Sequence, residues 1–156
     1  MAIDESVLQA ARAVFGEKGA GRVTLGAPVY ENVCHPEPLI GLTMGMVNRH
    51  GLIAGATGTG KTKTLQLIAE QLSAAGVPVF LADVKGDVSG IAVPGATNSN
   101  IEKRAQQTGQ AWKPAGFPVE FLSLSGKKGA QLRATVSSFG PMALAKVLDL
   151  NETQTS

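Results

Sequence analysis

The sequence predicts an α/β fold in which a parallel sheet is flanked by helices. The first observation is a short apolar run at 52–54, followed by a glycine-rich loop and a pattern of helical period over 61–75. The second is a continuous apolar run at 77–82, which is typical of a strand buried on both faces. The third observation is the composition: hydrophobic residues make up 44% of the chain, aromatic residues only 4%, and glycine occurs 19 times. This composition indicates a core of small aliphatic residues with many tight backbone positions, which suits an α/β fold. Strand, helix and strand in this order predict a right-handed parallel βαβ unit.

The chain begins with a predicted lead-in segment, residues 1–38, which precedes the main α/β domain, residues 39–156. Apolar residues recur with helical period over 4–15, and this helix is expected to end at Gly16 or Gly19. The elements expected next are a short strand at 22–25, an irregular proline-containing connection at 26–41 and a second short strand within 39–47.

The helix over 61–75 has the clearest pattern in the chain. Its apolar residues are Leu65, Ile68, Ala69 and Leu72, and Gly76 stands where a left-handed glycine ends a helix. The elements predicted downstream are a helix at 101–108, a strand at 119–124, a turn at 126–129, a strand at 131–137 and a helix from Pro141 through Leu148.

The loop at residues 55–62 satisfies the phosphate-loop pattern G-x-x-x-x-G-K-[ST], known as Walker A. Glycines at 55, 58 and 60 let backbone N–H groups approach a triphosphate closely. Lys61 is expected to reach the β- and γ-phosphates as the catalytic cation, and the Thr62 hydroxyl to ligate Mg²⁺. The predicted cofactors are therefore ATP and Mg²⁺; the alternative is a glycine-rich turn without a ligand. The residues predicted to contact the nucleotide are Gly55, Ala56, Thr57, Gly58, Thr59, Gly60, Lys61, Thr62, Lys63 and Asp83.

Asp83 follows the apolar run Val79-Phe80-Leu81-Ala82 and is expected at the carboxyl end of a parallel strand, where α/β sheets bind ligands. It would contact Mg²⁺ through water or organise its loop, whereas Lys85 and Asp87 have no assigned role and fit solvated loop charges equally well. Asp83-x-x-Gly86 also resembles a GTPase motif. The spacing argues against a GTPase, because the helix and strand leave no room for a switch loop, and no guanine-reading motif is present.

Bulk properties exclude several other classes of protein. The net charge of +2 permits a nucleic-acid partner without arguing for one, and the single cysteine, Cys34, allows no intrachain disulfide. The first residues lack the apolar stretch of a secretory signal, and no apolar run is long enough to span a membrane. We therefore expect a cytoplasmic protein with no membrane partner.

Three blocks of the sequence resemble the bacterial HerA-like ATPases of the YjgR type, within the HerA–FtsK group of motor ATPases. The blocks are Asn48 to Thr62, which includes the phosphate loop, Gly76 to Asp87, and Leu132 to Gln154. The resemblance implies a RecA-like P-loop core, ATP hydrolysis coupled to DNA translocation or unwinding, and a homo-oligomeric ring. It assigns no role to Arg49 and His50.

The sequence departs from this family in length. Family members are several times longer, and their Walker B strand, which ends in Asp-Glu, and their arginine finger lie beyond the part that matches. No Asp-Glu pair follows a strand-like apolar run in these 156 residues. We therefore expect an incomplete core, the N-terminal part of the ATPase domain, that does not hydrolyse ATP alone. A non-catalytic nucleotide-binding module and a small P-loop kinase are the alternatives.

Overall fold

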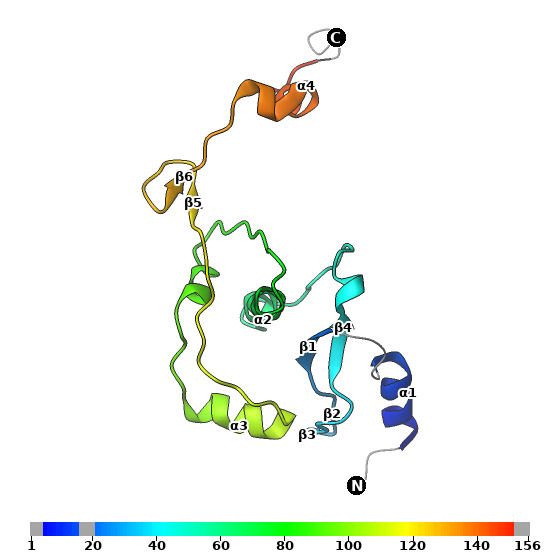
Figure 1. Ribbon diagram of the computed structural model, residues 1–156. Coiled ribbons are helices and arrows are strands. Elements are labelled where there is room, and N and C mark those ends of the chain that lie inside the picture. Colours follow the sequence, from blue (N-terminus) through cyan, green and yellow to red (C-terminus); the bar gives the residue numbers. More distant parts are fainter. Residues whose placement is uncertain (1–4, 16–20, 152–156) are drawn as a thin grey trace. The chain divides into compact units, whose positions relative to one another are not determined.

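The computed structural model describes residues 5–15 and 21–151 (Figure 1). The chain divides into two compact units, Met1–Pro118 and Val119–Ser156. The architecture is a mixture of helices and strands in which the described strands form three small sheets of two strands each. The α/β class is thus confirmed, but the described residues do not form the expected parallel sheet with helices around it.

The first unit begins with α1 (Glu5–Phe15) and a small antiparallel sheet of β1 (Arg22–Gly26) and β4 (Ile40–Thr43). A hairpin of β2 (Val29–Tyr30) and β3 (Val33–Cys34) lies between these strands in the sequence, and the short helix η1 (Met44–Met46) follows β4. The predicted helix and both predicted short strands are confirmed. The expected helix stop at Gly16 or Gly19 lies outside the described residues.

The central helix of the first unit is α2 (Lys61–Ala74), which confirms the strongest helical pattern. Its C-terminus is closed as predicted by Gly76, whose φ of 77° is left-handed. The N–H of Gly76 donates to the carbonyl of Ser73 at 2.9 Å, and the N–H of Val77 donates to the carbonyl of Leu72 at 2.9 Å. These are the two hydrogen bonds of a Schellman motif, so the helix ends in a defined geometry.

Helix α2 packs against β1 (Figure 1). The side chain of Gln71 joins the two elements. The Gln71 side-chain oxygen accepts the N–H of Thr24 at 2.7 Å, and its amide nitrogen donates to the carbonyl of Thr24 at 2.8 Å. The side chain therefore occupies both backbone hydrogen-bonding groups of Thr24 in the way that a neighbouring strand would.

Replacing Gln71 with leucine is expected to lower the free energy of unfolding by about 1–3 kcal/mol, because it leaves both partly buried backbone groups of Thr24 without these partners. Urea denaturation followed by circular dichroism measures the change. Gln107 is an exposed glutamine of the helix α3 (Ser99–Thr108), and its replacement by leucine should shift stability by no more than about 0.5 kcal/mol. Equal shifts in the two variants would contradict the proposed anchoring.

The strands predicted at 52–54 and 77–82 are not present as strands. A strand is stable only when its backbone groups pair with a neighbour and its side chains are covered. Neither segment has a ladder partner among the described residues, and Leu52 and Phe80 remain 89% and 81% exposed. The chain forms buried contacts again at η2 (Ser89–Ala92), where Ile91 is buried.

The helix expected at 101–108 is confirmed as α3, which begins two residues earlier than predicted. The Asn98 side chain caps it by accepting the N–H of Ile101 at 3.0 Å, and Gly109, with φ of 65°, ends it. The N-terminal cap explains the earlier start, because an asparagine side chain satisfies an amide that the first turn leaves unpaired.

The second unit contains β5 (Leu122–Ser123), β6 (Ala130–Gln131) and α4 (Val136–Val147). The strand predicted at 119–124 is reduced to two residues, and the one predicted at 131–137 is wrong beyond Gln131. Its final residues enter α4 because Thr135 caps that helix by accepting the N–H of Ser138 at 3.2 Å. Helix α4 is interrupted at Gly140, with φ of 70° and ψ of 162°, and Pro141 begins its second segment as expected.

In the two ranges that the structure describes, every helix is too short or too polar to cross a membrane.

Candidate phosphate-binding site

The glycine-rich loop before α2 contains backbone conformations that residues with a side chain rarely adopt. Gly58 and Gly60 have φ values of 81° and 94°, in the left-handed region. The Thr59 hydroxyl donates to the carbonyl of Ala56 at 2.8 Å and so tightens the turn. A Cβ atom placed on Gly55 would lie 2.6 Å from that hydroxyl oxygen. A larger residue at position 55 would therefore displace Thr59 and open the loop.

The loop leads directly into the N-terminus of α2, which carries no side-chain cap. Gly60 is the N-cap residue and has no side chain to accept an amide, and the first turn contains no acidic residue. The N–H groups at the start of a helix have no carbonyl acceptor within the helix, and the helix dipole favours negative charge there. This end of α2 is therefore suited to bind an anion.

The ammonium group of Lys61 is turned back onto the loop. Its Nζ donates to the carbonyls of Gly55 at 2.8 Å and Ala56 at 2.7 Å. The positive charge consequently lies at the start of the same loop whose other end is the helix N-terminus. Glycine backbone, amide donors and a lysine cation together fit a phosphate group.

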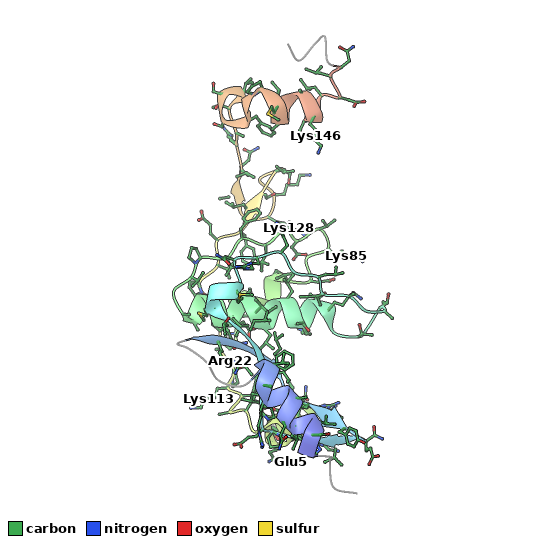
Figure 2. The ribbon with its side chains drawn as sticks, turned by 90° about the vertical axis from the view of Figure 1, so that its right-hand side faces the viewer. Glu5, Arg22, Lys85, Lys113, Lys128 and Lys146 are labelled. Atoms are coloured by element: carbon green, nitrogen blue, oxygen red, sulfur yellow. The ribbon has the colours of Figure 1, made fainter. Side chains whose placement is uncertain are left out.

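Asp83 organises the loop that follows the second apolar run. Its carboxylate accepts the N–H groups of Gly86 at 2.8 Å, Asp87 at 3.2 Å and Val88 at 3.0 Å. These bonds, with that of Val88 the largest influence, hold the pKa of Asp83 below its ordinary value of 3.8, against the opposing effect of desolvation. Lys85 lies on this loop with an exposed side chain (Figure 2).

Gln66, which belongs to no recognised motif of the sequence, joins this loop to α2. Its side-chain nitrogen donates to the carbonyls of Asp87 at 3.1 Å and Val88 at 3.4 Å, and its oxygen accepts from Lys63 Nζ at 2.9 Å. Gln66 is only 6% exposed. It shares its buried face with Ala69, one turn later, and this spacing was the one available signal.

The other predicted site residues occupy varied environments. Thr62 is half-buried in the first turn of α2, Thr57 is exposed, and Lys63 uses its ammonium on Gln66. Arg49 and His50 are both exposed. The contacts of all the predicted site residues with nucleotide and magnesium remain predictions.

Glu70 adds a half-buried carboxyl group one turn beyond Gln66 on α2. Desolvation raises its pKa, and the positive charge of Lys63 acts in the opposite direction. Lys63 therefore donates a hydrogen bond to Gln66 on its own helix, whereas Lys61 bonds carbonyls of the glycine-rich loop.

Comparison with known proteins places these elements in a family. The model of the family described as helicase HerA-like C-terminal matches residues 32–156, which include the glycine-rich loop, α2 and the Asp83 segment. Neither the curated proteins nor the solved structures contain a match. Because the family model covers most of the sequence and the whole candidate site, the chain belongs to the helicase HerA-like C-terminal family.

Proposed function

We propose that this chain binds the triphosphate of ATP at residues 55–62 and forms the phosphate-binding part of a RecA-like motor ATPase that acts on DNA. The observation that carries the proposal is the junction of the glycine loop with α2. There, an uncapped helix N-terminus, two left-handed glycines and the Lys61 ammonium are joined in one short segment. The proposal extends to a cytoplasmic, ring-forming assembly, in keeping with the family.

Each part of the loop would contact a different part of the nucleotide. The amides of the first turn of α2 would hold phosphate oxygens, and Lys61 would exchange its bonds with Gly55 and Ala56 for a bond to the terminal phosphates. The Thr62 hydroxyl would be the protein ligand of Mg²⁺. When bound, magnesium neutralises charge that develops on the transferred phosphoryl group.

A non-catalytic nucleotide-binding module is the second candidate, and one observation favours it. Both carboxylate oxygens of Asp83 are engaged by amides of its own loop. The side chain is therefore committed to organising the backbone, so it is a poor candidate for activating a water molecule.

Titration calorimetry with Mg·ATP, in the presence and absence of double-stranded DNA, tests the proposal. We expect saturable ATP binding without turnover by residues 1–156. DNA should shift the dissociation constant for ATP about fivefold or more, because linked sites typically change affinity by that factor. Binding that is indifferent to DNA would favour the module, and absence of ATP binding would contradict both candidates.

A further inference from the structure

We propose that Gln66 is a positioning residue that couples the phosphate loop to the Asp83 loop, residues 83–88. The inference rests on the proposed function, since the signal that Gln66 would transmit is nucleotide binding at the N-terminus of α2. It adds a role for a residue that lies outside the phosphate-loop pattern.

The Asp83 loop is held from two sides, and Gln66 provides one of them. The loop N–H groups of residues 86–88 point to the Asp83 carboxylate, whereas the carbonyls of Asp87 and Val88 accept the Gln66 amide. Gln66 is buried, and Val88 beside it is 8% exposed. A buried amide without these acceptors is costly, so the loop and the helix are expected to move together.

The same side chain also contacts the first turn of α2, which directly follows the phosphate loop. Its oxygen accepts from the Lys63 ammonium at 2.9 Å, and Lys63 lies in the first turn of α2, among the residues predicted to contact nucleotide. A bound anion that attracts the Lys63 ammonium, or that moves the first turn of α2, would therefore weaken the hydrogen bond between Lys63 and the Gln66 oxygen. The Gln66 nitrogen carries that change to the loop carbonyls.

The chain provides a matched control in Gln71. Gln71 is a second glutamine on α2 whose side chain also bonds a distant backbone, but its partner is Thr24 of β1. Loss of either glutamine removes long-range hydrogen bonds from the same helix. Only the loss of Gln66 disconnects the Asp83 loop, so the two variants separate coupling from general stability.

The experiment uses a fluorescent dye on the full 156-residue chain. Cys34 is first replaced by serine, and a thiol for labelling is introduced by Val84→Cys, since Val84 is 98% exposed on the Asp83 loop. We expect Mg·ATP to change the dye emission in this background and in Gln71→Leu. In Gln66→Leu the change should be lost, and the affinity for ATP, measured by calorimetry, should fall about fivefold or more.

A response that survives in Gln66→Leu, or that disappears equally in both variants, would overturn the coupling role while leaving ATP binding intact. Absence of ATP binding in the unsubstituted chain would overturn the proposed function and this inference with it. If Gln66→Leu does not fold, amide hydrogen exchange in the unsubstituted chain tests the coupling instead. In that chain, ATP should slow the exchange of the amides of residues 86–88 severalfold, and unchanged rates at those amides would refute the coupling.

Discussion

Replacing Lys61 with alanine is expected to weaken the binding of Mg·ATP by roughly 10- to 100-fold, the loss typical of a charge-assisted hydrogen bond. The ammonium is the only lysine group that bonds the glycine-rich loop in the described part of the chain. Its removal deletes the cation that would compensate the terminal phosphates. Isothermal titration calorimetry at fixed salt measures the change in the dissociation constant.

The control for this variant is Lys128→Ala, which removes the same charge from an exposed turn of the second unit. The dissociation constant of Lys128→Ala for ATP should stay within about twofold of the unsubstituted value, because solvent and salt screen an exposed charge and the bonds of Lys61 to the loop are kept. The amide exchange of α2 should be preserved in Lys61→Ala, so that weaker binding does not reflect unfolding. Equal losses in the two lysine variants would show that affinity depends on net charge and not on the loop.

Replacing Asp83 with asparagine is expected to release the loop at residues 84–88. An asparagine side chain has one acceptor oxygen and an NH₂ group that confronts an amide donor, so it cannot accept all three loop N–H groups. We expect hydrogen exchange of the amides of Gly86, Asp87 and Val88 to accelerate severalfold. Asp87→Asn, the matched change in charge on the same loop, should leave these rates nearly unchanged.

The same bonds predict how the order of this loop depends on pH. The pKa of Asp83 is lowered in the folded state, so its carboxylate stabilises the loop fully above the ordinary value of 3.8. The contribution is lost as pH falls through the lowered pKa, when the carboxylate is protonated. Exchange experiments from pH 6 down to about pH 3, corrected for intrinsic rates, should show the loop loosening only at the acidic end. Loosening near neutral pH would contradict the assignment.

Helices were predictable from this sequence to a degree that strands were not. Helix α2 has its hydrophobic period and its Gly76 stop within its own residues, so local information suffices. The runs at 52–54 and 77–82 have the composition of strands, but a strand requires a partner from elsewhere in the chain. Without such a partner among the described residues, these segments stay exposed, and composition alone could not reveal this.

The candidate site was predictable where its geometry depends on residue type. Glycines at 58 and 60 adopt the left-handed backbone that only glycine adopts readily, and the position of Lys61 follows from the motif. The partners of Asp83 were not predictable, and the burial of Gln66 had no signal except its helical spacing to Ala69. They depend on how the Asp83 loop folds back on α2, and a glutamine in a helix is usually a surface residue.

The attachment of Lys61 to the carbonyls of Gly55 and Ala56 has a consequence for ligand design. The protein already supplies the cation with oxygen acceptors, so under the proposed function a phosphate would replace these internal partners and gain the difference between the two sets of bonds. The same two bonds hold the unliganded loop in its curved conformation, and this pre-organisation lowers the conformational entropy lost on binding. A competitive inhibitor for this loop should therefore be rigid and should place charged oxygen atoms where they can replace both carbonyls as acceptors of the Lys61 ammonium.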